Sequence, residues 1–181
     1  MVKTFYLMRH GQTRFNVQGR IQGACDSPLT DEGIEQAKAA RRYFEQEGIS
    51  FTRVYSSTQE RACDTAELAT GLVDYIRLKG IKEMDFGAYE AHQEYLNPPV
   101  HHEDGSGYRD FFVRYGGEST AQVYERMERT IREVLEASKE DETLLFVSHG
   151  GAIMQFYLHA TKNPPAPKKT SSKLCDFQNN L

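Results

Sequence analysis

Four short apolar segments alternate along the chain with longer segments whose apolar residues recur every three or four positions. The short segments are rich in β-branched and aromatic side chains and have the length of buried strands. They lie at residues 3–8, 53–57, 74–78 and 143–148. Strands that alternate with helices form a mostly parallel sheet that is covered on both faces. The sequence therefore predicts an α/β fold, a three-layer α/β/α sandwich with a mostly parallel central sheet.

The longer segments carry the start and stop signals of helices. Thr30 is a favourable N-cap for a helix whose first turn holds Asp31 and Glu32, and Gly48 is expected to end that helix. A second helix is expected to close at Gly71. In the third and longest helix, the apolar residues follow one side. The helices are predicted at residues 30–48, 58–72, 118–139 and 151–160.

Two segments do not fit this alternation. Residues 95–117 are interrupted by prolines and glycines, as loops are, yet they carry several aromatic side chains. Long ordered loops in compact domains are usually functional, so we expect a loop-rich lid segment at about residues 92–117. The segment that begins at Asn163 is polar and broken by prolines, and its pattern predicts neither a helix nor a strand.

Length and composition exclude several classes of protein. The 181 residues fit one domain over residues 1–181, and a net charge of −4 gives no general reason to expect nucleic acid or an anionic membrane as a partner. Cys25, Cys63 and Cys175 form no Cys-x-x-Cys pair, so we expect reduced thiols in the cytoplasm. No segment has the roughly 18 apolar residues of a membrane span, and the N-terminal run is too short for a signal peptide. The oligomeric state is left open, a homodimer being one alternative.

Arginines and histidines follow three of the predicted strands. Arg9-His10-Gly11 ends the first, Arg61 follows the second, and His149-Gly150-Gly151 ends the last. The carboxyl ends of parallel strands share one edge, so these side chains are expected to converge in a cationic site. Two guanidinium forks beside two imidazoles suit a tetrahedral dianion such as phosphate. Backbone N–H groups at the glycines, including Gly150, are expected to approach the same oxygens.

A histidine in such a pocket can also be a nucleophile. Neutral imidazole can displace an alcohol from phosphorus, and the residues alone allow either His10 or His149 in this role. The departing alkoxide needs a proton, so a carboxylic acid is expected opposite the nucleophile. Glu83, Asp85 and Glu90 all follow the third predicted strand and are candidates.

The same residues have plainer interpretations. Arg61 could form a surface ion pair with Glu60 or Asp64, which would contribute little to stability. Ser56 and Ser57 are not set in the Gly-x-Ser-x-Gly motif of serine hydrolases. Three further histidines lie in the loop segment without the spacing of a zinc helix, so a solvated loop is the favoured interpretation. They are His92, His101 and His102.

Six short motifs, taken in order, resemble those of the histidine phosphatase superfamily, the phosphoglycerate mutase-like group. A single motif such as Arg-His-Gly would be weak evidence, but the series reaches from residue 9 to residue 151. The motifs are Arg9-His10-Gly11-Gln12-Thr13-Arg14-Phe15-Asn16, Asp26-Ser27-Pro28-Leu29-Thr30-x-x-Gly33-x-x-Gln36-Ala37, Ser56-Ser57-x-x-x-Arg61-Ala62-x-x-Thr65-Ala66, Glu83-x-x-Phe86-Gly87, Gly117-Glu118-Ser119 and Ser148-His149-Gly150-Gly151.

The resemblance implies a phosphoglycerate mutase-like fold and assigns roles that the residues alone leave open. It implies that His10 is the phosphorylated nucleophile, that Glu83 is the proton donor, and that no metal or other cofactor is used. Asn16 matches a further position of the phosphate pocket, and Gln22-Gly23 resembles the part that touches the substrate beyond its phosphate. The residues implied to hold the phosphoryl group are Arg9, Arg61 and His149.

The chain departs from the family pattern at three places. The family often has Glu-Gly where this chain has Glu90-Ala91. The segment at residues 87–116 is short beside that of true phosphoglycerate mutases. Family members also usually carry a further strand near the C-terminus, and the pattern here predicts none, so the chain is either truncated or abbreviated at that edge of the sheet.

These features favour a metal-independent phosphatase that hydrolyses a small organic phosphate monoester through a phosphohistidine. The alternatives are a phosphoglycerate mutase-type phosphoryl transfer, which the short segment disfavours, and a phosphate-ester binding protein with little turnover. The aromatic residues of the loop segment form either a wall for the organic part of the substrate or packing against the core. They include Tyr95, Phe111, Phe112 and Tyr115.

Overall fold

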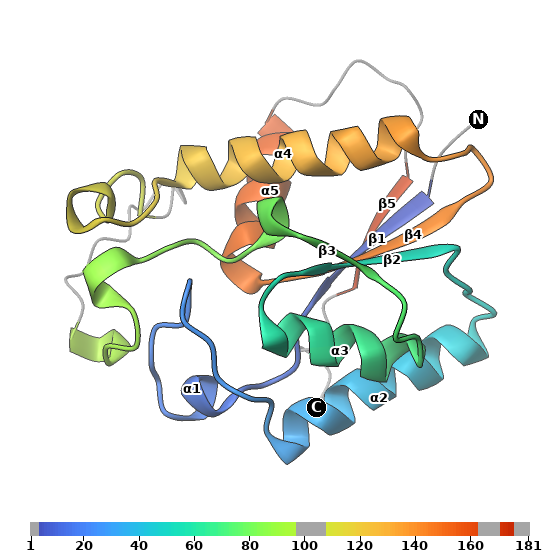
Figure 1. Cartoon of the computed structure of the whole chain (residues 1–181), viewed down its shortest axis with the longest axis horizontal. Helices are drawn as coiled ribbons and strands as arrows, with labels where there is room; N and C mark the ends of the chain where they lie inside the picture. The colour runs from blue at the N-terminus through green and yellow to red at the C-terminus, as the bar shows by residue number, and fades with distance from the viewer. Residues whose placement is uncertain (1–3, 97–107, 163–170, 176–181) are drawn as a thin grey trace.

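The central sheet has five strands in the order β3-β2-β4-β1-β5, and every pairing between neighbours is parallel. The computed structural model describes residues 4–96, 108–162 and 171–175 (Figure 1). The strands are β1 (Thr4–Arg9), β2 (Arg53–Ser57), β3 (Ile76–Leu78), β4 (Thr143–Ser148) and β5 (Ser171–Cys175). The predicted mostly parallel sheet is confirmed.

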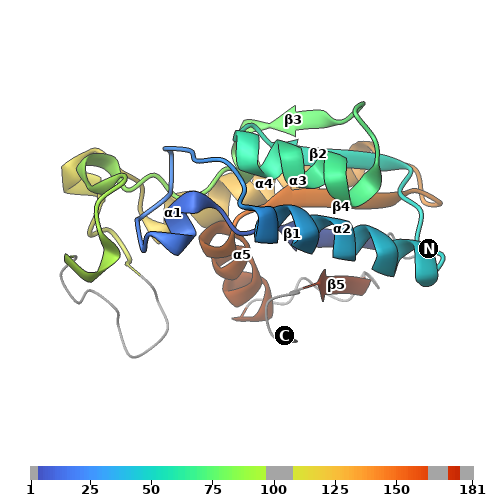
Figure 2. The ribbon, with the colours of Figure 1, turned by 90° about the horizontal axis from the view of Figure 1, so that it is seen from below.

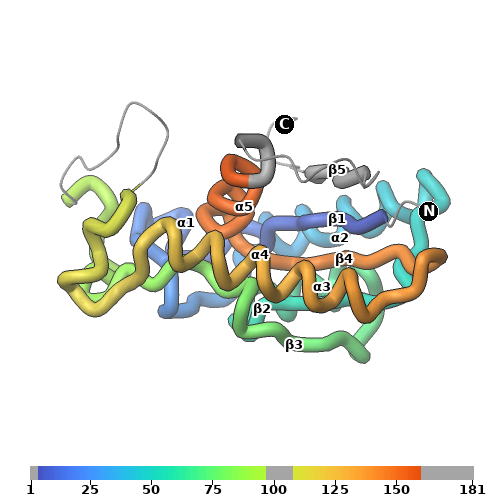
Figure 3. The backbone as a smooth tube through the Cα atoms, turned by 90° about the horizontal axis from the view of Figure 1, so that it is seen from above, coloured from blue at the N-terminus to red at the C-terminus, as the bar shows by residue number. Residues whose placement is uncertain are grey.

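Helices cover both faces of the sheet. Figure 2 shows α2 (Asp31–Gln46) and α3 (Glu60–Thr70) on one face, and Figure 3 shows α4 (Thr120–Ala137) on the other. The fourth long helix is α5 (Gly150–Lys162), which packs beside α4. A single turn, α1 (Arg14–Val17), follows β1. The predicted three-layer α/β/α sandwich is therefore confirmed.

Alternation along β1 divides the core into two parts. Phe5 and Leu7 pack on the side of α4, whereas Tyr6 and Met8 pack on the side of α2 and α3. Successive side chains of a strand point to opposite faces, so a strand buried on both sides has a continuous apolar sequence. This is why the first and last strands could be predicted from their continuous apolar sequences.

The predicted helix ends agree with the structure to within a few residues. The Thr30 hydroxyl accepts a hydrogen bond from the Gly33 N–H at 3.0 Å, and α2 begins at the next residue. Gly71 ends α3 in the left-handed conformation, with φ of +72°. Ser119 caps α4 through a capping box with Gln122. Within the described part of the chain, no helix is long and apolar enough to cross a membrane.

The sheet register brings two of the predicted motifs together. Arg9, the last residue of β1, lies opposite Ser148, the last residue of β4. The next N–H along β1, that of His10, donates to the Ser148 carbonyl at 3.0 Å. His10 and His149 therefore leave adjacent central strands at the same edge of the sheet.

The strand β5 corrects the expectation that the C-terminal edge lacks a strand. It pairs with β1 from Thr4 opposite Ser171 to Met8 opposite Cys175. A strand at the edge of a sheet pairs on one side alone and does not need the long apolar sequence of a central strand. The largely polar sequence of this segment therefore gave no strand signal.

The aromatic side chains of the loop segment are mainly packed inward. Phe112 is fully buried in the core beside β1 and β4, and its ring lies 4.9 Å from that of Phe86. Phe111 and Tyr115 pack around Tyr89. Tyr95, by contrast, is 80% exposed. Packing against the core thus accounts for Phe112, and the part of the predicted lid at residues 97–107 lies outside the described residues.

Ala91 adopts a backbone conformation that suits the glycine expected there from the family pattern. Its φ is +63°, in the left-handed region. Its N–H donates to the Ile21 carbonyl at 3.0 Å, and its carbonyl accepts from Arg20 Nη1 at 2.9 Å. These bonds hold the turn although a side chain is present, so the Glu-Gly turn geometry is retained with local strain.

We expect Ala91→Gly to raise the free energy of unfolding by about 0.5–1 kcal/mol, because relief of left-handed strain exceeds the added flexibility of the unfolded chain. Urea unfolding measures this change. Ala88→Gly, in the neighbouring turn at ordinary φ, is the control and should lower the free energy of unfolding by up to about 1 kcal/mol. Equal destabilisation by both variants would contradict the assigned strain.

Candidate active site

His10 is held as one tautomer at the carboxyl end of β1. Its side chain is buried, and Nδ1 lies 2.7 Å from the Gly11 carbonyl oxygen. A carbonyl can only accept, so Nδ1 carries the proton and Nε2 keeps its lone pair. Arg61 Nε lies 3.2 Å from this Nε2 and donates to it. The hydrogen bonds thus present Nε2 as the nucleophilic atom of the ring.

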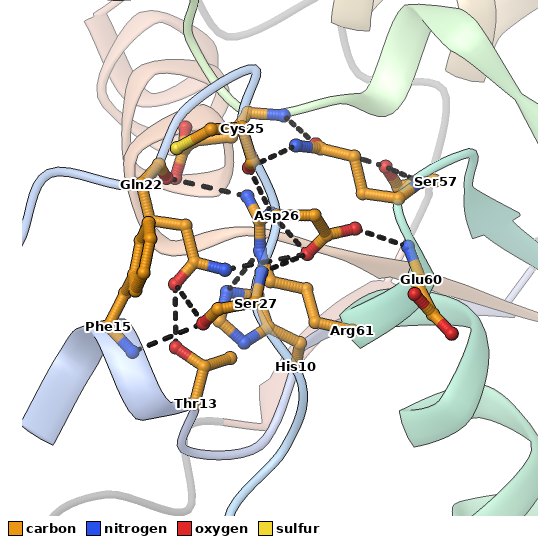
Figure 4. Close-up of polar contacts among 12 residues, drawn as sticks. His10, Thr13, Phe15, Gln22, Cys25, Asp26, Ser27, Ser57, Glu60 and Arg61 are labelled. Carbon is orange, nitrogen blue, oxygen red and sulfur yellow. Dashed lines mark hydrogen bonds and ion pairs between the residues drawn. The ribbon is translucent and has the colours of Figure 1, made fainter. Parts of the chain in front are cut away.

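Arg61 is fully buried, which rules out the surface ion pair with Glu60 or Asp64. Its guanidinium is surrounded by the loop at residues 22–26 (Figure 4). Nη1 donates to the Cys25 carbonyl at 2.9 Å and to Asp26 Oδ1 at 2.8 Å, and Nη2 donates to the Gly23 carbonyl at 3.1 Å. The Asp26 carboxylate therefore balances the buried charge of Arg61.

His149 lies beside His10 at the end of β4. The two ring centroids are 5.1 Å apart. Both ring nitrogens of His149 are buried, and neither has a hydrogen-bond partner among the residues that the structure describes. Buried polar atoms normally have a partner, so this ring is suited to donate to, or accept from, a bound group.

Both imidazoles are neutral near pH 7. Burial, followed by the charge of Arg61 and to a smaller extent that of Arg9, lowers the pKa of His10 from 6.5 to about 3. Burial and the Arg61 charge likewise lower the pKa of His149. The expected cationic site therefore owes its positive charge to the arginines, and His10 is in the unprotonated form that a nucleophile requires.

Arg9 ends β1 and packs against the turn between β4 and α5. A Cβ placed on Gly150 would lie 3.1 Å from Arg9 Cζ, so Gly150 leaves room for the guanidinium. Arg9, His10, Arg61, His149 and Gly150 thus come together at one edge of the sheet, as the sequence predicted. Their catalytic and binding roles remain predictions.

Glu83 lies at the N-terminus of α5. Its carboxylate accepts hydrogen bonds from the Gly151 N–H at 2.9 Å, the Ala152 N–H at 2.8 Å and the Met84 N–H at 2.8 Å. The Gly151 N–H, expected on a phosphate oxygen, is therefore occupied by Glu83. The Gly11 N–H is likewise bound, to Thr65 Oγ1 at 3.1 Å.

The other two candidate carboxylates have local structural roles. Asp85 Oδ1 accepts from the Gly87 N–H at 2.8 Å. Glu90 accepts from the N–H groups of Ala24 at 2.7 Å, Phe86 at 2.9 Å, and also Gly23 and Cys25. Glu83 is thus the candidate that contacts the turn after His149, whereas Glu90 fixes the loop that surrounds Arg61.

The predicted substrate-contacting residues have further structural partners. Asn16 Oδ1 accepts from the Thr13 N–H at 3.0 Å within the capping box of α1. The Gln22 side chain lies 2.6 Å from Thr13 Oγ1. A Cβ on Gly23 would lie 2.0 Å from the Met84 carbonyl oxygen, so this position needs glycine. The Gln22 carbonyl contacts Arg61, Asn16 is joined to Gln22 through Thr13, and Gly23 is a packing residue of its loop.

Sequence reasoning missed several residues that support the site. Gln59 Nε2 donates to the Gly23 carbonyl, and its Oε1 accepts from the Glu83 N–H at 3.1 Å. Asp26 begins the second of the six family-like motifs, and this was a sequence signal for its role. No sequence signal pointed to Gln59. Within the described ranges, no three His, Cys, Asp or Glu side chains are grouped as metal ligands. His92 is exposed, and His101 and His102 lie outside the described residues.

Two neutral imidazoles and two arginines at the edge of a parallel sheet define a class of α/β protein suited to bind a phosphoryl group. A comparison of the sequence with known families identifies the superfamily within this class. Residues 5–175 match the histidine phosphatase superfamily (branch 1), which is nearly the whole chain. The protein belongs to this superfamily, and the family resemblance of its motifs is confirmed.

Named relatives include phosphatases and a mutase. A metal-independent phosphoserine phosphatase of Arabidopsis thaliana is 31% identical over 92% of this chain and 72% of its own length. A probable phosphoglycerate mutase of Proteus mirabilis is 36% identical, over 82% of this chain and 70% of its own. A 6-phosphofructo-2-kinase/fructose-2,6-bisphosphatase of Caenorhabditis elegans is 33% identical over 81% of this chain, which spans 32% of that protein.

A solved structure agrees with this assignment. The phosphoserine phosphatase of Entamoeba histolytica, in complex with 3-phosphoglyceric acid, superposes with a TM-score of 0.71 at 30% identity. The superposition covers 88% of this chain and 80% of that one.

The lowered pKa of His10 predicts a loss of stability in acid. Below about pH 6.5 the unfolded chain binds a proton at this position that the folded chain excludes down to about pH 3. The free energy of unfolding therefore falls as pH decreases through this window, by up to about 1.4 kcal/mol per pH unit for one group. Urea unfolding between about pH 7 and pH 5 measures the slope.

His10→Gln cannot titrate there and should make this slope shallower. The exposed His92 provides the matched control, because His92→Gln should leave the slope unchanged. A slope that is the same in His10→Gln and in the wild type would contradict the assigned neutral state of His10.

Proposed function

We propose that this protein is a metal-independent phosphatase that hydrolyses a small organic phosphate monoester through a phosphohistidine at His10 Nε2. The observation that carries the proposal is the fixed tautomer of His10. Its Nδ1–H is bound to the Gly11 carbonyl, and its Nε2 lone pair faces Arg61 Nε at 3.2 Å. A buried neutral imidazole held in this way needs no separate base before it attacks phosphorus.

In the first step, His10 Nε2 forms a bond to phosphorus while the bond from phosphorus to the alcohol oxygen breaks. Glu83 gives its proton to that oxygen, so the alcohol leaves neutral. Arg9 and Arg61, with N–H donation from His149, stabilise the charge on the phosphoryl oxygens. The Arg61 Nε–H occupies the Nε2 lone pair, so this hydrogen bond must first be released; the N–H then turns to a phosphoryl oxygen as Nε2 attacks.

In the second step, water attacks phosphorus and the phosphorus–nitrogen bond breaks. The Glu83 carboxylate takes the proton from the water, which restores its acid form for the next turnover. Inorganic phosphate leaves, and His10 returns to the neutral imidazole. Each step is an in-line displacement in which positioning and charge stabilisation lower the barrier.

Small phosphates with a three-carbon skeleton are the first substrates to test. The Arabidopsis relative is a phosphoserine phosphatase, and the Entamoeba phosphoserine phosphatase was solved with 3-phosphoglyceric acid. Phosphoserine and phosphoglycerates therefore head a screen that also includes sugar phosphates, nucleotides and cofactor precursors.

We expect His10→Ala to lower the hydrolysis of p-nitrophenyl phosphate and phosphoserine by at least about a thousandfold, because the attacking atom is removed. Released phosphate is measured with a metal chelator present. His92→Ala, at an exposed histidine outside the site, is the control and should keep wild-type activity. Near-normal turnover by His10→Ala would overturn the proposed mechanism.

A mutase is the second candidate, favoured by the Proteus relative. The fate of labelled phosphate distinguishes the two reactions. A phosphatase releases the label as inorganic phosphate, which is the outcome we expect, whereas a mutase retains it on an organic product. A binding protein with little turnover would release no phosphate and, by mass spectrometry after brief incubation with substrate, would show no phosphorylated His10.

A further inference from the structure

Arg126, on α4, makes five hydrogen bonds, which go to the segment that carries Glu83 and to Glu118, just before α4. Its Nη1 donates to the Gly80 carbonyl at 2.9 Å and to the Lys82 carbonyl at 2.7 Å. Its Nη2 donates to the Glu83 carbonyl and to Glu118 Oε2, both at 2.9 Å, and its Nε donates to Glu118 Oε1 at 2.8 Å. All five N–H groups of the guanidinium are therefore used.

The Arg126–Glu118 pair is largely withdrawn from water. The side chains are 15% and 26% exposed. Burial opposes ionisation of Glu118, but the hydrogen bonds and charge of Arg126 outweigh it and hold the pKa of this carboxyl below its usual value. A bidentate pair of this kind fixes the plane of the guanidinium. The three carbonyl contacts therefore have defined directions.

Glu118 extends the same network to the far side of Glu83. Its Oε2 accepts from the Asp85 N–H at 3.0 Å, and its own N–H donates to the Asp85 carbonyl at 2.8 Å. Gly80 lies directly on α4, since a Cβ there would lie 1.8 Å from Thr130 Oγ1. The backbone is thus held against α4 at Gly80, Lys82, Glu83 and Asp85.

From these contacts we infer that Arg126 is a positioning residue for Glu83, which it holds beside the N-terminus of α5 through the backbone of residues 80–85. The inference rests on the proposed function, in which Glu83 is the proton donor. Arg126 bonds to the main chain of Glu83, whereas the Glu83 carboxylate bonds to the N-terminus of α5. Arg126 therefore sets the backbone position without using the acid group.

A positioning role for Arg126 predicts a loss of rate that depends on the leaving group, whereas a general loss of structure would slow all substrates alike. A serine-type alkoxide needs a proton as it departs, whereas p-nitrophenolate is stable without one. Displacement of Glu83 should therefore slow phosphoryl transfer from an alkyl phosphate more than transfer from p-nitrophenyl phosphate. The ratio kcat/KM reports this first transfer, because it covers the steps up to release of the alcohol and does not include the later hydrolysis of the phosphohistidine.

The experiment compares Arg126→Gln with Glu83→Gln on p-nitrophenyl phosphate and on phosphoserine, or on the alkyl phosphate that the wild type hydrolyses fastest. Loss of the acid in Glu83→Gln should lower kcat/KM for the alkyl ester by about a hundredfold or more. Arg126→Gln should lower it by about ten- to a hundredfold, as expected for a catalytic group moved by about 1 Å. In both variants the loss for p-nitrophenyl phosphate should be markedly smaller, and inhibition by inorganic phosphate should be unchanged.

Arg132→Gln is the matched control on α4, where Arg132 forms an exposed ion pair with Glu128. It should behave as the wild type on both esters. Arg126→Lys retains the positive charge, which also acts on His149, but offers three donors in place of five. Arg126→Lys should therefore still lower kcat/KM more for the alkyl ester than for p-nitrophenyl phosphate. This variant also provides a second test if Arg126→Gln does not fold.

An equal loss on both esters in the Arg126 variants, or wild-type behaviour of Arg126→Lys, would overturn the positioning role while the proposed function stands. If Glu83→Gln itself lacks leaving-group selectivity, Glu83 is not the proton donor and the inference fails with that assignment. If His10→Ala remains active, the phosphohistidine mechanism fails independently of either result.

Discussion

The buried guanidinium of Arg61 is the constraint around which the site is built. A charge removed from water is costly unless hydrogen bonds and an opposite charge replace its solvation. The loop at residues 22–26 supplies both, through its carbonyl groups and the Asp26 carboxylate. Glu90 in turn binds the N–H groups of this loop from its other side. The position of Arg61 over His10 thus depends on two carboxylates that do not themselves contact the histidine.

The sequence was most informative where one physical signal dominated. The strands β1 and β4 are buried on both faces, so their apolar runs were continuous and their ends clear. Thr30 and Gly71 mark helix ends because each satisfies backbone groups that the helix leaves unpaired. The edge strand β5 was missed because it pairs with β1 on one side alone and its sequence is mixed. This segment is a strand because it pairs with β1, which is distant in the sequence, and its local sequence pattern does not indicate a strand.

The site was predictable in outline and not in its hydrogen bonding. Parallel topology was enough to expect His10 and His149 side by side, because both follow strands at one edge of the sheet. The sequence could not reveal that Glu83 takes the Gly151 N–H, or that Gly23 is required by the nearby Met84 carbonyl. These contacts join segments about 70 and 60 residues apart, and no local spacing encodes them. The same holds for Arg126, whose three carbonyl partners lie more than 40 residues away.

In the proposed reaction, the locked, neutral state of His10 determines whether the imidazole or the phosphate ester is protonated first as the pH falls. The dianion of a phosphate monoester takes up a proton near pH 6 and becomes a monoanion. Because burial holds the pKa of His10 at about 3, the nucleophile remains unprotonated well below that point. Mild acidification therefore changes the charge of the substrate before it changes the imidazole. In that reaction, protonation of the ester and the loss of folding stability would set the lower limit of the working pH range, before His10 Nε2 is protonated in the folded protein.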